Sequence, residues 1–137
     1  MREILFRGKR TDNGEWVEGG FYSEDYSGRK NITYWNSFGL GFMDYKEVYS
    51  ATVGQYAGRK DKNGIKIFEG DILKGEAVID GESETVYLHV AYMNDDIFGC
   101  GFFAMQGEEF ECIDKSICSE FTVAGNIYDN PELLREE

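Results

Sequence analysis

The sequence predicts a mainly β protein, either a sandwich or a small barrel. Glycine occurs 17 times in 137 residues and separates short apolar runs at intervals of about ten residues. In the longest run, 85–93, apolar and polar side chains alternate, and Val86, Leu88 and Val90 face one way. Helical periodicity is almost absent. A content of 10 Phe, 9 Tyr and 2 Trp argues against disorder.

The first predicted element is a β-hairpin at the N-terminus. Asn13-Gly14 lies between the strand-like runs 4–6 and 15–17, and a second pair, Asn63-Gly64, lies between comparable runs. A two-residue type I′ turn needs positive φ at both central positions, which Asn and Gly tolerate best. The sequence therefore predicts two hairpins with type I′ turns.

Residues 21–50 are expected to form a long loop rich in aromatic side chains. They hold nine aromatic residues mixed with Gly, Ser and Asn, and Tyr34 and Trp35 are among them. Tyr and Trp offer a large contact area at low entropic cost. The loop either packs on the core or forms an interface, and the sequence leaves both interpretations open.

The later elements follow from shorter patterns. Gly70-Asp71 makes a corner before an apolar strand, and apolar residues at 110, 112, 121 and 123 indicate two further strands. In 130–134, Asn suits a helix cap, Pro suits the first helical position and Glu suits the helix dipole. We expect one or two helical turns there, held by Leu133 and Leu134.

The net charge of −12 is unevenly distributed. Residues 1–66 hold 11 basic and 9 acidic side chains, whereas 67–137 hold 3 basic and 17 acidic ones. Neither half offers the basic field that nucleic acid requires, and the acidic half would repel DNA and anionic membranes. Three interpretations stay open: simple solubility, binding of a cationic protein or of the unlike half of a second copy, and mimicry of DNA.

Several features predict a cytoplasmic protein without a membrane partner. The start of the chain lacks the apolar segment of a signal peptide, and no apolar run reaches the roughly 18 residues of a membrane span. Cys100, Cys112 and Cys118 are odd in number and lack C-x-x-C spacing, which is typical of reduced cysteines packed as small hydrophobes.

Residues suited to catalysis are scarce. His89 is the one histidine and falls on the more polar face of its strand, so no Ser–His–Asp or Cys–His arrangement is expected. A zinc site would lack a fourth ligand, and neither a phosphate loop nor a dinucleotide loop is present. We predict no catalytic, cofactor-binding or metal-binding residues. The alternative is a carboxylate metal site built from at least two of Asp71, Asp80, Asp95, Asp96 and Asp114.

Three segments carry a family resemblance. The opening segment is 2–8 with 14–17, and the middle one, 53–72, contains Val-Gly-Gln-Tyr-Ala-Gly-Arg-Lys-Asp-Lys-Asn-Gly. The closing segment, 125–134, reads Gly-Asn-Ile-Tyr-Asp-Asn-Pro-Glu-Leu-Leu. Together they resemble the YopX-like family of phage and prophage proteins over about half of the chain. Ala57 and Arg59 depart from the family, which often has a hydroxyl residue and Leu there.

The resemblance implies a small, mainly β fold related to SH3-like barrels, encoded by phages or prophages and present in the cytoplasm of the bacterial host. It implies no catalytic residue, cofactor or substrate. Its motifs either build turns or form a polar binding edge, for which the candidate residues are Gln55, Tyr56, Lys60, Asp61 and Lys62.

We therefore predict one YopX-like domain over 1–137, with an N-terminal hairpin and aromatic loop in 1–50, an SH3-like barrel in 51–137 and a short C-terminal helix. Tyr34 and Trp35 complete the candidate interaction surface. The expected function is that of a non-catalytic accessory protein that binds an unknown protein partner or forms a homo-oligomer. The alternatives are an acidic DNA mimic that inhibits a host DNA-binding protein, and a metal-dependent enzyme with a carboxylate site.

Overall fold

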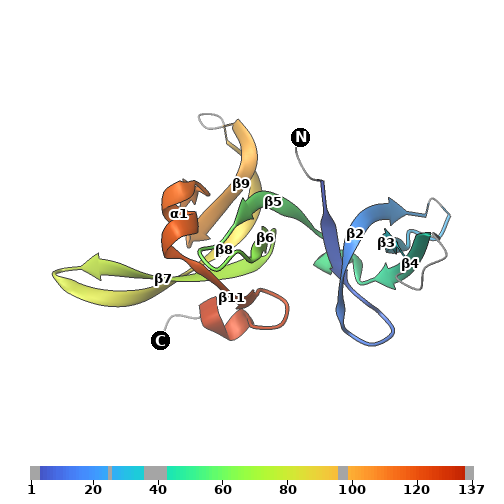
Figure 1. Cartoon of the computed structure of the whole chain (residues 1–137), viewed down its shortest axis with the longest axis horizontal. Coiled ribbons are helices and arrows are strands. Elements are labelled where there is room, and N and C mark those ends of the chain that lie inside the picture. The colour runs from blue at the N-terminus through green and yellow to red at the C-terminus, as the bar shows by residue number, and fades with distance from the viewer. Residues whose placement is uncertain (1–3, 25, 36–42, 96–98, 135–137) are drawn as a thin grey trace. The chain divides into compact units, whose positions relative to one another are not determined.

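The described part of the chain is mainly β, as predicted. The computed structural model describes residues 4–24, 26–35, 43–95 and 99–134 (Figure 1). The chain divides into two compact units, Met1–Tyr56 and Ala57–Glu137. The prediction of one domain with an internal boundary after residue 50 stays a prediction.

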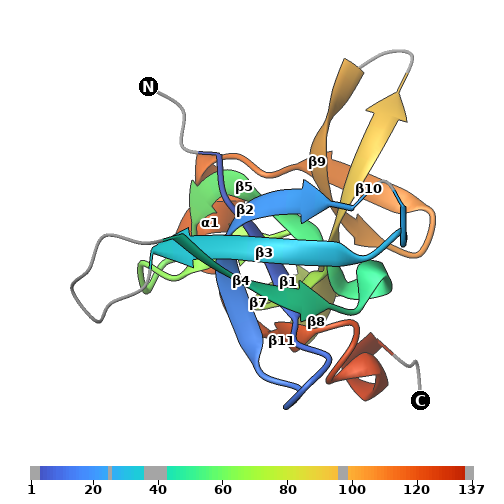
Figure 2. The same ribbon diagram turned by 90° about the vertical axis from the view of Figure 1, so that its right-hand side faces the viewer.

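The first unit is an antiparallel meander. Its strands are β1 (Phe6–Lys9), β2 (Trp16–Ser23), β3 (Lys30–Trp35) and β4 (Met43–Val48). They lie side by side in the order β4-β3-β2-β1 (Figure 2), so the predicted N-terminal hairpin forms. The 3₁₀ turn η1 (Ser50–Thr52) leads into β5 (Gly54–Lys60), which pairs with β1 and carries the chain into the second unit.

A small core holds the first unit together. Ile32 and Val48 are buried, and Gly8 approaches so closely that a Cβ there would lie 2.8 Å from Val48. Phe6 and Phe21 meet edge to face with ring centroids 5.6 Å apart. The prediction of a long loop over residues 21–50 is wrong in part, because the end of β2 and the whole of β3 and β4 lie within that range.

The second unit is built on a five-stranded antiparallel sheet of order β10-β9-β8-β7-β11. After the end of β5 comes β6 (Lys66–Phe68), and the sheet strands are β7 (Asp71–Ile79), β8 (Glu82–Asp95), β9 (Gly99–Gln106), β10 (Glu109–Cys112) and β11 (Thr122–Asn126). The helix α1 (Lys115–Glu120) separates the last two strands, and the 3₁₀ turn η2 (Pro131–Leu134) follows β11. This turn stands where the C-terminal helix is predicted.

The core of the second unit lies between one face of the sheet and α1. Leu73, Leu88, Val90 and Ala104 come from neighbouring strands, and their cross-strand pairing places them on the same face. The buried side chains that join them are Ile67, Ile113, Ile117 and Phe121. The alternation predicted for 85–93 is confirmed, since Leu88 and Val90 are the buried members of that run.

The two Asn-Gly pairs lie in turns, but the predicted type I′ geometry is wrong. Neither Asn13 nor Asn63 has positive φ, whereas Gly14 and Gly64 do. At the second pair, Asp61 donates its amide hydrogen to the Ile65 carbonyl, and the loop of three residues ends in the left-handed Gly64. This is the longer hairpin turn in which one glycine supplies the only left-handed residue.

The predicted SH3-like barrel is not confirmed. Within the described residues the two sheets are open and no closed barrel forms. None of the helices in that part of the chain is long and apolar enough to cross a membrane.

Candidate functional site

A two-stranded arm, defined here as residues 75–86, projects from the sheet of the second unit. β7 pairs with β11 only as far as Lys74, and β8 pairs with β9 only from His89 onward. Between these points the two strands pair with each other, so the arm extends beyond the sheet (Figure 1). Its turn is Asp80-Gly81, with φ values of 53° and 83°, which is the type I′ geometry.

The tip of the arm carries apolar side chains in contact with solvent. Val78 is 77% exposed and Ile79 is 45% exposed. The Ser83 and Thr85 hydroxyls donate to the Glu76 carboxylate at 3.3 and 3.0 Å, which links the two strands on one face. The other face carries Ile79 and turns toward α1.

The helix α1 is fixed against the base of the arm by its cap and its apolar side. Asp114 accepts a hydrogen bond from the Ile117 amide at 3.1 Å, as an N-cap residue does. Ile117 and Phe121 then point into the core. A Cβ at Gly75 would lie 2.7 Å from the Phe121 ring, so glycine at this position lets the helix end approach the sheet.

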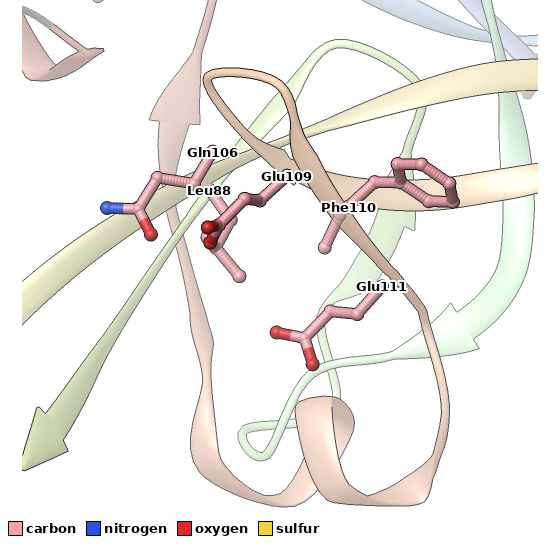
Figure 3. Close-up of a pocket in the computed structure, with 6 residues that line it drawn as sticks. Leu88, Gln106, Glu109, Phe110 and Glu111 are labelled. Carbon is pink, nitrogen blue, oxygen red and sulfur yellow. The ribbon is translucent and has the colours of Figure 1, made fainter.

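The hairpin β9–β10 forms the opposite side. Its two-residue turn begins at Gly107, with φ of 61°. Phe110 packs edge to face on Phe103, with centroids 5.4 Å apart. Because side chains alternate along a strand, Glu109 and Glu111 point to the other face, where both carboxylates border the same depression over Leu88 (Figure 3).

These three elements enclose what we call the acidic groove. It consists of two adjoining depressions of about 220 and 430 Å³ that share Leu88, Gln106 and Glu111. Its floor is apolar and its rim is carboxylate. The lining residues are Glu76, Ala77, Val78, Ile79, Val86, Leu88, Ala104, Gln106, Glu109, Phe110, Glu111, Ser116, Ile117, Glu120 and Phe121.

The groove carries negative charge without a matching cation. None of its described lining residues is Lys or Arg. Glu76 and Glu120 also border a neighbouring depression lined by Lys62 and Lys74. The depression beside Glu109 and Glu111 is lined by no described Lys or Arg. Both glutamates are exposed, and they stand about 7 Å apart because they are alternate residues of one strand. These two side chains therefore define the most negative part of the groove.

The groove does not hold a recognisable catalytic set. Among the described residues no group of three or more His, Cys, Asp and Glu side chains could hold a metal ion. Cys118 is partly buried, and burial raises the pKa of its thiol, which keeps the thiolate scarce. His89 lies on the other face of β8, in a separate depression of about 350 Å³ beside Tyr87, Met105 and Leu133.

The residues predicted for a polar binding edge are not brought together as an exposed surface. Tyr56 and Asp61 are each only 6% exposed, so their predicted place on a surface is wrong. Gln55 is half-buried in β5, opposite Phe6 in the first unit. Lys60 and Lys62 are exposed in the second unit and stay candidates. Tyr34 and Trp35 end β3, and their side chains lie outside the described residues.

Asp61 is buried because it organises the backbone around it. One carboxylate oxygen accepts hydrogen bonds from the Asn63 and Ile65 amides, both at 2.9 Å. The other oxygen accepts from the Val123 amide at 2.9 Å. Asp61 thus closes its own hairpin turn and fastens it to β11.

The closing motif has a similar structural use. The Asn126 side-chain oxygen accepts from the Tyr128 and Asp129 amides at 3.0 and 2.9 Å. The Ile127 amide donates to the carbonyl of Gly70, which is in the left-handed region with φ of 90°. Asp71 is 1% exposed and accepts from the Phe68 amide at 2.8 Å. These contacts build turns within the middle and closing motifs and tie the two motifs to each other.

Fold and groove define a mainly β protein with an acidic surface groove in its second unit. A family model described as YopX protein matches residues 5–135. The chain therefore belongs to the YopX family, and the resemblance found in the sequence is confirmed.

A solved structure shares the fold. The crystal structure of protein EF1440 from Enterococcus faecalis aligns with a TM-score of 0.60 and 24% sequence identity. The alignment covers 98% of this chain and 100% of that one. At this identity the likeness shows the fold alone. No curated protein matches the chain significantly.

Proposed function

We propose that this protein acts without catalysis, by binding another protein through the acidic groove. The observation that carries the proposal is the combination of an apolar floor, a carboxylate rim and the exposed Val78 and Ile79 on an arm that pairs only with itself. Exposed apolar surface framed by polar groups is typical of interaction sites. A stable complex buries roughly 1,200–2,000 Å² in total, so the partner would also contact the arm or α1 around the groove.

The proposed setting is a phage or prophage accessory role in the bacterial cytoplasm. Membership of the YopX family supports it, since the resemblance implies that origin. Free Cys112, exposed at the end of β10, fits a reducing compartment.

Site-specific photo-crosslinking in the host tests the proposal. A benzoylphenylalanine at Ile79 places the reactive group in the groove, and the same substitution at Ile65 is a matched control because that isoleucine is 54% exposed outside it. We expect a discrete protein adduct from position 79 and none of the same mass from position 65. Identical adducts at both positions, or none at position 79 in cells that carry the phage, would refute binding through the groove.

A DNA mimic is the second candidate, favoured by the 17 acidic against 3 basic side chains after residue 66. In that case the captured partner binds DNA with the same surface. Duplex DNA should then displace this protein from the purified partner in a competition experiment. A partner that binds both at once rules the mimic out and leaves groove binding intact.

A further inference from the structure

The carboxylates of Glu109 and Glu111 are the strongest indication of what the groove holds. Both are exposed on one face of β10, and neither forms an ion pair with a described Lys or Arg. Like charges at neighbouring positions repel, and a cation between them removes that repulsion. The groove is thus electrostatically complementary to a Lys or Arg side chain.

The floor between the carboxylates and α1 favours apolar side chains and not cations. Val86 and Leu88 from β8 and Ile79 from β7 line it, next to Ile117 and Phe121 of the helix side. Covering such a surface is favourable by roughly 25 cal/mol per Å² of apolar area removed from water. Leu88, Ile117 and Phe121 are already buried in the core, so the apolar area open to a partner belongs chiefly to Ile79, which is 45% exposed, and to the half-buried Val86. A purely cationic polymer would leave these two side chains uncovered, so charge alone does not describe the occupant.

We infer that the occupant is a segment of a second protein that carries Lys or Arg together with apolar side chains. The cations meet Glu109 and Glu111, and the apolar side chains cover Val86 and Ile79. This inference rests on the proposed function and names the chemistry of the partner.

Charge also separates this occupant from the others. A second copy brings its own net charge of −12, so its approach is opposed at long range. Nucleic acid and anionic lipid are repelled by the same carboxylates. A basic, partly apolar protein segment gains from both the rim and the floor.

Binding of three labelled peptides to the full-length protein tests the inference. The first is a twelve-residue amphipathic peptide of Lys and Leu, the second has Ser in place of Leu at the same charge, and the third has Glu in place of Lys. Measured by fluorescence anisotropy at low salt, the Lys/Leu peptide should bind about tenfold more tightly than the Lys/Ser peptide. The Glu/Leu peptide should not bind.

Two matched double variants locate the binding. Replacing Glu109→Gln and Glu111→Gln should weaken the Lys/Leu peptide about fivefold at low salt, and the loss should shrink in 0.5 M salt. Replacing Glu18→Gln and Glu132→Gln removes the same charge from exposed positions outside the groove lining, and should change affinity less than twofold. Ile79→Ser should weaken the Lys/Leu peptide but not the Lys/Ser peptide.

Equal losses in the two double variants, or equal affinity for the Lys/Leu and Lys/Ser peptides, would overturn the inference. Thermal unfolding of each variant shows that the protein is folded in the assay. Separate outcomes contradict the proposed function and this inference. A crosslink from position 79 to a segment that lacks Lys and Arg would overturn the inferred chemistry of the partner, but it would still support binding of a protein through the groove. Tight binding of a second copy of this protein in the groove would also overturn the inference that the occupant is a segment of a different protein.

Discussion

At the residue scale, Asp61 is predicted from the sequence to be a binding residue, but in the fold its carboxylate holds the backbone together. It stands between Lys60 and Lys62 in a turn, which in the sequence is typical of an exposed polar edge. In the fold, its carboxylate accepts three backbone N–H groups from two different elements. Such an interaction between residues 61 and 123 has no local signal, because it depends on how β11 is placed.

We predict that Asp61→Ala destabilises the protein by about 3 kcal/mol. The substitution removes the acceptor of three amides in a buried position, and a hydrogen bond to a charged group contributes about 1.5–3 kcal/mol. Urea unfolding measures the change. The neighbouring Lys62→Ala is the control and should stay within about 0.5 kcal/mol, because Lys62 is exposed. Equal effects of the two substitutions would contradict the role of Asp61.

His89 leads to a prediction about pH. Burial lowers its pKa in the folded protein below the ordinary value of 6.5. Between the folded and unfolded pKa values the unfolded chain binds more protons, so stability falls as pH drops below about 6.5. The His89→Gln variant should lose less stability than the wild type between pH 7 and pH 5. Parallel pH profiles of the free energy of unfolding for the two proteins would show that His89 does not contribute.

At the element scale, the contact between β7 and α1 depends on a single glycine. A Cβ at Gly75 would lie 2.7 Å from the Phe121 ring, whereas a Cβ at Gly101 in β9 would meet nothing within 4 Å. Neither glycine has positive φ. We predict that Gly75→Ala costs about 1–3 kcal/mol by overpacking and that Gly101→Ala is close to neutral. Chemical unfolding of both variants checks this, and a neutral Gly75→Ala would mean that α1 can move away without loss.

The length of an element decides whether it can be predicted from the sequence, as strand 85–93 and the helix α1 show. The long alternating strand 85–93 is evident because its period is two over nine residues. α1 has only six residues, too few for a helical period, and its one local signal is Asp114 as a possible cap. The Asp80-Gly81 pair is a further hairpin signal, because Asp-Gly tolerates the positive φ values that a type I′ turn needs. The position of the arm is therefore evident from the sequence, although its exposure is not.

The groove itself could not be predicted from the sequence. Its rim comes from β10, and its floor and far side come from β7, β8 and α1, which are brought together only by the order of strands in the sheet. The informative pair is Glu109 and Glu111, two residues apart. The predicted barrel is not confirmed for a related reason: turn spacing predicts strands but does not determine whether the edges of a sheet close.

At the scale of the whole molecule, the uneven charge makes self-association testable through its dependence on salt. The predicted homo-oligomer depends on attraction between the basic side chains of 1–66 and the acidic ones of 67–137 in a second copy. Screening weakens such attraction, whereas it relieves the repulsion between two chains of net charge −12. We predict that the repulsion dominates and that the mass seen by light scattering stays at the monomer mass of 15.6 kDa at low salt. A mass above 15.6 kDa at low salt that falls in 0.5 M salt would instead support the predicted homo-oligomer. A mass that rises with salt would assign any association to apolar surface instead. A monomer at every concentration and salt would leave a foreign protein as the occupant of the groove.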